Sequence, residues 1–176
     1  MLDLFSRNET ISEVPTSSLK FFLLPVLLGD LNAKLVDNND RLELIKIVEA
    51  YYLDFLQRVK DYEIVDDLKV PKPMEHQEER PAPRGPPDLS LMNKERDEKI
   101  CRYKERKTLE NRLKQLKIAA DNPSCDDDVM RNFYLNTIKR FALTSLDELE
   151  SLKQVQFYFF NVATNHGSSI YLVHLC

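Results

Sequence analysis

The sequence predicts an all-α protein, and three observations support this fold class. Glycine is scarce, with only three residues in 176, so few positions favour the tightest turns. Apolar residues recur at helical intervals over long segments of the chain. Most of the nine prolines lie in one stretch, residues 71–87, between two regions of helical pattern. We therefore expect a helical bundle interrupted by one proline-rich linker.

Two helices are predicted before the linker. The first begins within residues 16–18, which are N-cap residue types, and carries apolar residues at 19 and 21–24 before Pro25. Pro25 has no backbone N–H, so we expect this buried helix to be kinked there. The second helix spans about 39–62, and its apolar residues cover more than half of its circumference. That coverage predicts neighbours on several sides and makes it the expected central helix.

The composition changes abruptly at the linker, which we place at residues 68–90. It has few large apolar side chains to offset the entropy of ordering, so we expect it to be disordered or extended. The linker lies inside a helical domain, residues 1–155. A hydrophobic tail, residues 156–176, follows; its consecutive aromatic residues define no single helical face, and 168–176 reads as a strand.

Three further helices are predicted after the linker. One occupies residues 94–120 and is stopped by the sequence DNPS. A second begins at residues 126–128, where three aspartates suit the positive end of a helix dipole. A third begins at Ser145, because Ser145 and Glu148 have the spacing of a capping box.

The charge of the chain is unevenly distributed. The net charge is −4, which gives no general basic footprint for nucleic acid. Lys94 to Lys117, however, contains ten Lys and Arg against five Asp and Glu. A solvated helix face is the ordinary interpretation of such a run.

Helical phase argues for a second interpretation of this charged run. The core-facing side of this helix carries leucines towards its C-terminal end. Followed towards the N-terminus at the same helical spacing, that side carries cations in place of leucines: Ala120, Leu116, Leu113, Leu109, Arg106, Arg102 and Lys99. Arg96, Lys99 and Tyr103, spaced i, i+3 and i+7, share one face, with Arg102 and Arg106 beside it. We interpret this face as a candidate docking surface for a carboxylate-rich partner, because guanidinium and ammonium groups pair with carboxylates.

The sequence shows no pattern of a catalytic, cofactor or metal site, so we expect a protein that is not an enzyme. It contains no glycine-rich phosphate loop. The histidines lie in the linker and the tail, at His76, His166 and His174. The cysteines are far apart and form no C-x-x-C pair, which disfavours a disulfide framework and a zinc site: Cys101, Cys125 and Cys176.

A cytoplasmic location fits this cysteine usage. The N-terminus lacks a basic region followed by an apolar one, so no secretory signal is indicated. The longest early apolar run, residues 21–28, is too short to cross a membrane.

Five segments, in order along the chain, resemble the immunoglobulin-binding protein 1 family, also called the alpha four regulatory subunit of type 2A phosphatases. Together they extend over roughly residues 2–153. The segments are LDLFSRNE (2–9), SLKFFLLP (18–25), EKICRYKERKTLENRLKQLK (98–117), FYLNTIKRF (133–141) and SLDELESL (145–152). Their common order is more specific than any one of them alone.

The resemblance implies a tetratricopeptide-like or 14-3-3-like antiparallel helical array without catalytic activity. It implies binding to the catalytic subunits of protein phosphatase 2A and the related type 4 and type 6 phosphatases, their stabilisation or sequestration, and a link to TOR signalling. In this family the phosphatase-contacting Arg and Lys lie just upstream of an R-Y-K motif, here residues 102–104. The matching positions are Arg96 and Lys99, with possible support from Arg102, Tyr103 and Arg106.

The chain departs from the family pattern at both ends. Family members have helices before LDLFSRNE, so we expect the apolar faces around 21–28 and 51–59 to be less covered here. After about Lys153 they continue with a polar helix and a long C-terminal region, where this chain has its hydrophobic tail. Two other functions remain open: a basic helix that binds nucleic acid or an acidic membrane, and a truncated fragment without retained activity. The sequence does not indicate an oligomeric state.

Overall fold

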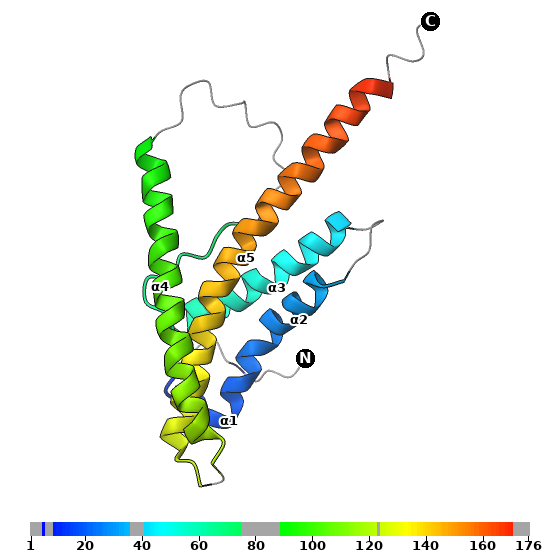
Figure 1. Cartoon of the computed structure of the whole chain (residues 1–176). Coiled ribbons are helices and arrows are strands. Elements are labelled where there is room, and N and C mark those ends of the chain that lie inside the picture. The colour runs from blue at the N-terminus through cyan, green and yellow to red at the C-terminus, as the bar shows by residue number, and fades with distance from the viewer. Residues whose placement is uncertain (1–4, 6–8, 36–40, 75–88, 123, 171–176) are drawn as a thin grey trace, which may run out of the picture.

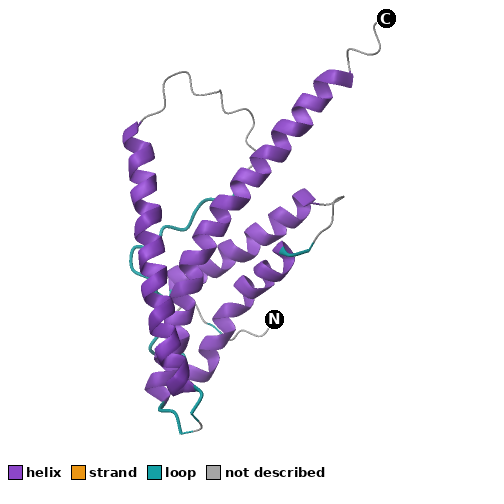
Figure 2. Ribbon diagram, viewed as in Figure 1, coloured by secondary structure: helices purple, strands orange, loops and turns teal. Residues whose placement is uncertain are grey.

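The computed structural model describes residues 5, 9–35, 41–74, 89–122 and 124–170, with side chains up to Phe159. Its elements, in chain order, are α1 Thr16–Leu19, the 3₁₀ helix η1 Lys20–Leu23, α2 Leu24–Ala33, α3 Arg41–Asp61, α4 Leu89–Ala120 and α5 Asp127–Ile170. Every regular element in this described part is helical, which confirms the predicted fold class (Figure 2).

The helices form two antiparallel hairpins, α2 with α3 and α4 with α5 (Figure 1). Helix α5 also packs against α1, η1 and α3, so it joins the two hairpins. The central helix is therefore α5, and the prediction that gave this place to α3 was wrong. The sequence predicted burial around more than half of α3, but its buried apolar side chains form one stripe: Ile45, Val48, Tyr52, Phe55, Leu56 and Val59.

The kink predicted at Pro25 is present as a short 3₁₀ segment, η1, that runs directly into α2. Pro25 lies in the first turn of α2, where a helix tolerates a residue without an N–H donor. The predicted N-cap at residues 16–18 is not formed, because α1 follows Pro15 without a side-chain cap. The Thr16 hydroxyl instead donates to Asp127 Oδ2, 2.8 Å away in α5.

Helix α3 ends in a left-handed turn and continues into packed chain. Glu63 has φ = 51°, and the backbone N–H of Ile64 donates to the carbonyl of Val59 across this residue. The next residues lie against the core: Leu68 is buried, and the N–H of Met74 donates to the buried Glu49 carboxylate at 2.6 Å. The start of the predicted linker, 68–74, is thus attached to α3, and the linker's prolines at 81–87 lie outside the described residues.

The main core gathers between α1, η1, α3 and α5. The ring centroid of Phe5, from the LDLFSRNE segment, lies 4.2 Å from that of Phe22 with the two rings tilted, and Tyr62 meets Phe22 edge to face at 5.0 Å. Helix α5 contributes a stripe at positions i, i+4, i+7 and i+11, each almost fully buried: Ile138, Ala142, Ser145 and Leu149.

Helix α5 is continuous where two separate helices and a strand-like end were predicted. Its start is as predicted, with the Asp126 side chain accepting from the N–H of Asp128. The capping-box interpretation of Ser145 is wrong, because Ser145 is buried in mid-helix. Residues 168–170 are helical rather than extended, and 171–176 lie outside the described residues.

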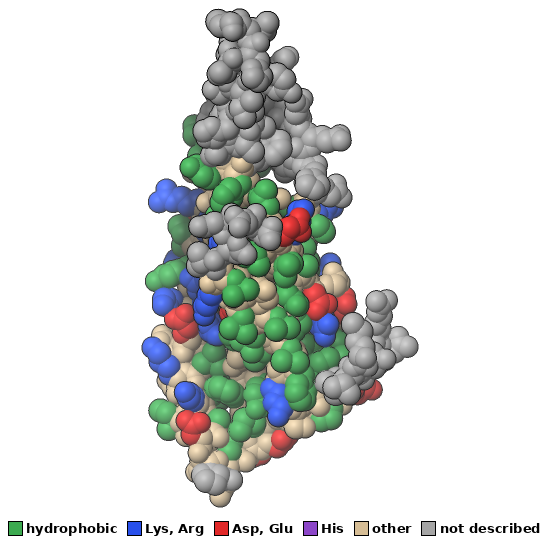
Figure 3. Space-filling view, turned by 90° about the vertical axis from the view of Figure 1, so that its right-hand side faces the viewer, with side chains coloured by type: hydrophobic (Ala, Val, Ile, Leu, Met, Phe, Trp, Pro, Cys, Tyr) green, Lys and Arg blue, Asp and Glu red, His purple; other side chains and the backbone are tan. Residues whose placement is uncertain are grey.

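An apolar surface covers the side of the molecule formed by α2 and α3 (Figure 3). Its exposed side chains come from one face of α2, the second residue after α2 and the outer side of α3: Leu24, Leu27, Leu28, Leu31, Leu35, Leu42 and Ile47. Of the two apolar faces expected to be less covered, 21–28 has exposed leucines at 24, 27 and 28, whereas 51–59 has Phe55, Leu56 and Val59 buried. Within the described residues, no helix combines the length and apolar character that a membrane crossing requires.

The first turns of α5 fasten the N-terminal segment. The Arg131 guanidinium donates to the carbonyl oxygens of Val14, at 2.8 Å, and of Ile11. It also lies 3.4 Å from the Thr16 hydroxyl, which is bonded to Asp127. Charge-assisted bonds of this kind are stronger than neutral ones.

Replacing Arg131 by Met should lower the free energy of unfolding by about 2–4 kcal/mol, because it leaves carbonyl oxygens without their charged donor. Urea denaturation followed by circular dichroism measures this loss. Arg112→Met is the matched control, since Arg112 is exposed on α4 and makes no ion pair with described residues. Equal stability of the two variants would contradict the fastening role.

Gly29 of α2 allows close contact with α3. A Cβ at this position would lie 2.9 Å from Cε1 of Tyr52. The Tyr52 ring has little freedom to move, because it is buried and its hydroxyl donates to Asp30 at 2.7 Å. Burial, followed by this hydrogen bond, raises the pKa of Tyr52, so the hydroxyl stays a donor through the neutral range.

Gly29→Ala should therefore destabilise the protein, although Ala favours helix over Gly by about 1 kcal/mol. Overpacking costs roughly 1–3 kcal/mol, so we expect a net loss of up to about 2 kcal/mol. Thermal unfolding measures it, with exposed Leu31→Ala on the same helix as the control. If Gly29→Ala melted at or above the wild-type temperature, the Tyr52 ring would have moved to make room for the added methyl group.

Candidate functional site

Helix α4 carries the predicted docking surface, and only half of its length is packed. Leu109 is buried, and Leu113 and Leu116 are half-buried at the predicted phase. From residue 89 to 101 every side chain of α4 is exposed. The predicted leucine seam therefore holds α4 against α5, and the N-terminal part of α4 extends beyond that contact (Figure 1).

The cations that continue the seam pair with two carboxylates of α5. Arg102 Nε lies 3.0 Å from Asp147 Oδ1, and Arg106 Nη1 lies 2.9 Å from Asp147 Oδ2. Glu150, three residues further along the same face of α5, is 3.3 Å from Arg102 Nη2 and 2.7 Å from Lys99 Nζ. We call this chain of contacts, Lys99, Glu150, Arg102, Asp147 and Arg106, the ionic chain.

Exposure increases along the ionic chain towards Lys99. The side chains of Arg102 and Arg106 are 22% and 25% exposed, and Asp147 between them is 33% exposed. At the other end, Lys99 is 49% and Glu150 39% exposed. Ion pairs lose strength with solvent exposure, so the Lys99 end is the weaker part of the chain.

The two remaining predicted residues face solvent. Arg96 is exposed and makes no ion pair with any residue that the structure describes. The Tyr103 ring is half-exposed, with the cations of Arg106 and Lys107 5.8 Å and 5.7 Å from its centroid. Thus Arg96, Lys99 and Tyr103 form an accessible strip along one side of α4, which we call the docking strip.

Lys107 is itself paired at the end of the docking strip. Its ammonium lies 2.8 Å from Glu110, and this hydrogen bond and charge raise the pKa of Lys107. The same bond lowers the pKa of Glu110, so both groups stay charged at neutral pH. Lys107 therefore adds a neutralised pair beside Tyr103, whereas Arg96 offers an uncompensated guanidinium.

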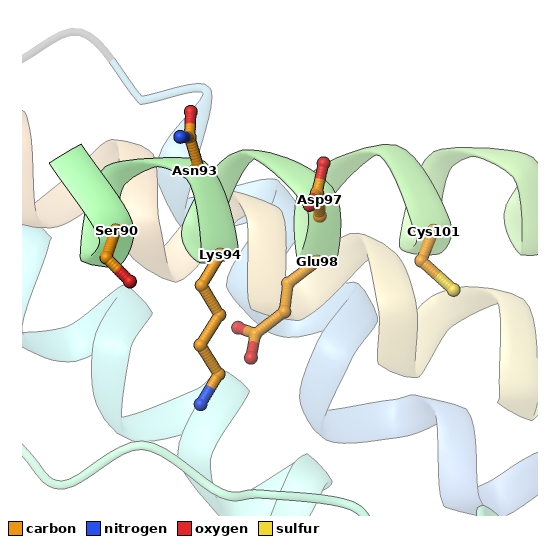
Figure 4. Close-up of a pocket in the computed structure, with 6 residues that line it drawn as sticks. All are labelled: Ser90, Asn93, Lys94, Asp97, Glu98 and Cys101. Carbon is orange, nitrogen blue, oxygen red and sulfur yellow. The ribbon is translucent and has the colours of Figure 1, made fainter.

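A shallow depression lies along the other side of α4. Lys94 and Glu98 extend to one side of it and Asn93 and Asp97 to the other, with Ser90 and Cys101 at its ends (Figure 4). It is lined by this single helix and open to solvent. Helical rotation of about 100° per residue places it largely opposite Lys99 and Tyr103. An open groove of mixed charge on one helix has no enclosed space for a substrate.

A second groove lies between α4 and α5, where Lys114 and Lys117 approach Phe133 and Arg140. It too is open to solvent. Among the described residues, no group of three or more His, Cys, Asp or Glu side chains could hold a metal ion.

The cations could be predicted from the sequence, but their partners Asp147 and Glu150 were not. A signal for this pairing was present in the hairpin geometry. In an antiparallel hairpin, residues equally far from the turn lie opposite one another, and Arg102 and Asp147 are each roughly twenty residues from the turn after Ala120. Glu150, one helical turn further from it, meets Lys99 in the same register.

Comparison with known proteins agrees with this fold. A family model described as the TAP42-like family matches residues 1–155. Immunoglobulin-binding protein 1 family member C of Homo sapiens is 31% identical over 156 residues, covering 87% of this chain and 46% of that protein. Type 2A phosphatase-associated protein 42 of Saccharomyces cerevisiae is 29% identical over 170 residues, covering 85% and 46%.

A third relative is the serine/threonine-protein phosphatase 4 regulatory subunit ppfr-4 of Caenorhabditis elegans, 27% identical, with 85% of this chain and 45% of that protein covered. The chain spans less than half the length of these curated relatives. A solved structure titled "The Structure of Tap42 Alpha4 Subunit" superposes with a TM-score of 0.57 at 26% identity, covering 82% of this chain and 69% of that one. The segment resemblance, the family match over most of the sequence and the shared helical fold lead to one conclusion: the chain belongs to the TAP42-like family.

Proposed function

We propose that this protein is a non-catalytic regulatory subunit that binds the catalytic subunits of protein phosphatase 2A and of the related type 4 and type 6 phosphatases. It stabilises or sequesters those subunits and so connects them to TOR signalling. Family membership and the names of its relatives, which include type 2A and type 4 phosphatase regulators, support the proposal.

The exposed pair Arg96 and Lys99 is the observation that carries the proposal. The two residues are one turn apart on the unpacked half of α4, where a partner can reach them without opening the core. Arg96 has no intramolecular carboxylate among described residues, so its guanidinium is available for a bidentate contact. Tyr103 extends this surface with an apolar ring and a hydroxyl.

Arg102 and Arg106 have a different role in this proposal. Both are largely covered and bonded to Asp147, so they orient α4 on α5 rather than meet the partner. This also weighs against a nucleic-acid or acidic-membrane binder, because internal pairing removes cations from the basic run. We propose a cytoplasmic location, which the free thiols of Cys101 and Cys125 support.

Reversing both charges, Arg96→Glu with Lys99→Glu, should weaken binding of purified protein phosphatase 2A catalytic subunit by thirtyfold or more. Loss of partly desolvated charge pairs costs about 2–5 kcal/mol, and the reversal adds repulsion. Calorimetric titration measures the affinity after circular dichroism confirms equal helix content.

Lys94→Glu with Lys104→Glu is the matched control, since both residues are exposed on the other side of α4 and the change in net charge is the same. The control should bind almost as tightly as the wild type. If both variants lost the same affinity, the effect would come from net charge and not from a site at Arg96 and Lys99. A helical wild type that binds DNA or anionic vesicles in place of the phosphatase would favour the alternative function.

A further inference from the structure

We propose that Glu150 is an internal competitor for the docking strip: it holds Lys99 in the free protein and is displaced by a carboxylate of the partner. This inference rests on the proposed function and adds a step to it. Docking would then be an exchange of one carboxylate for another on Lys99, while Arg96 is available from the start.

The geometry of the Lys99 pair supports an exchange. Lys99 Nζ and Glu150 Oε1 are 2.7 Å apart, within charge-assisted hydrogen-bond distance, so the ammonium is engaged. Yet Lys99 is 49% and Glu150 39% exposed, so water and an incoming group reach both. Exposed ion pairs shift equilibria by roughly fivefold or less, so the partner can replace this contact at small cost.

Glu150 retains a bond when it loses Lys99. Its other oxygen, Oε2, is 3.3 Å from Arg102 Nη2, and Arg102 is held independently by Asp147. The released carboxylate is therefore not left without a cation. The exchange moves only the ammonium of Lys99. The contacts among Arg102, Asp147 and Arg106 remain, and so does the packing of α4 on α5.

The partner that fits is an acidic protein surface with two carboxylates about one helical turn apart. One pairs with Arg96 without displacing anything that the structure describes. The other must be a better ligand for Lys99 than Glu150 is. Because Glu150 occupies that position, a partner with a single carboxylate gains little from Lys99, so the internal competitor raises selectivity for paired acidic groups.

Glu150→Gln tests the exchange, since it removes the competing charge and keeps the shape. Titration with purified protein phosphatase 2A catalytic subunit should show binding about two- to fivefold tighter than the wild type. Glu148→Gln, the same charge change at an exposed residue of α5, should leave the affinity unchanged. With Lys99→Gln in the background, Glu150→Gln should have no effect, and high salt should shrink the difference.

Asp147→Asn should act in the opposite direction. Asp147 fixes both arginines, and an amide carries no charge and only one acceptor oxygen, so the N-terminal half of α4 is held less firmly. We expect binding about two- to fivefold weaker, with Asp147→Glu restoring part of it.

The outcomes separate the two proposals. If the wild type binds the catalytic subunit and Glu150→Gln binds it with equal or lower affinity, the exchange is overturned and the proposed function stands. An equal gain with Glu148→Gln also overturns it, since only net charge would then matter. If neither the wild type nor Glu150→Gln binds the catalytic subunit although both have normal helix content, the exchange and the proposed function are both overturned.

Discussion

Helix α5 has to satisfy two different neighbours at once, and this requirement shapes the molecule. One face carries Ile138, Ala142, Ser145 and Leu149 into the core, where small side chains between larger ones let α3 approach closely. Another face meets α4, whose leucine seam lies near the turn, and further out the carboxylates of α5 pair with the cations of α4. An apolar contact alone would not fix the rotation of α4. The two arginines on Asp147 do, because hydrogen bonds are directional and hydrophobic contact is not.

Local signals predicted the parts of the fold that local chemistry determines. The kink before Pro25, the start of α5 at its aspartates and the end of α4 at Ala120 follow from neighbouring residues alone. The continuity of α5 did not, since a serine three residues before a glutamate suits a cap or a helix interior equally well, and only burial by α3 decides. Phase analysis placed Arg102 and Arg106 correctly on the α5 side but could not choose their partners among 29 acidic residues.

The ionic chain shows how one row of cations can serve two purposes. Its inner members, Arg102 and Arg106, are largely covered, and its outer members, Lys99 and Glu150, are more exposed. The proposed recognition surface therefore lies at the end of the chain where the packing of α4 on α5 stops. A helix that was entirely solvated would present its cations without a fixed orientation. One that was entirely packed would present none. Near Lys99 this arrangement places an exposed side chain on a helix that Arg102 and Asp147 hold against α5.

The fastening of the N-terminal segment by Arg131 also governs how the chain matures during synthesis. Its contacts with Ile11 and Val14 join residues 120 and 117 positions apart. At roughly 5–20 residues per second, the ribosome needs on the order of ten seconds to make the second partner after the first. The contacts between α2 and α3 are local in sequence and do not need α5, whereas the apolar side of this hairpin that packs on α5 has no cover until α5 is made. The contacts of residues 11–14 with Arg131 are thus completed only after the chain has been made as far as α5, later than the contacts within the α2–α3 hairpin.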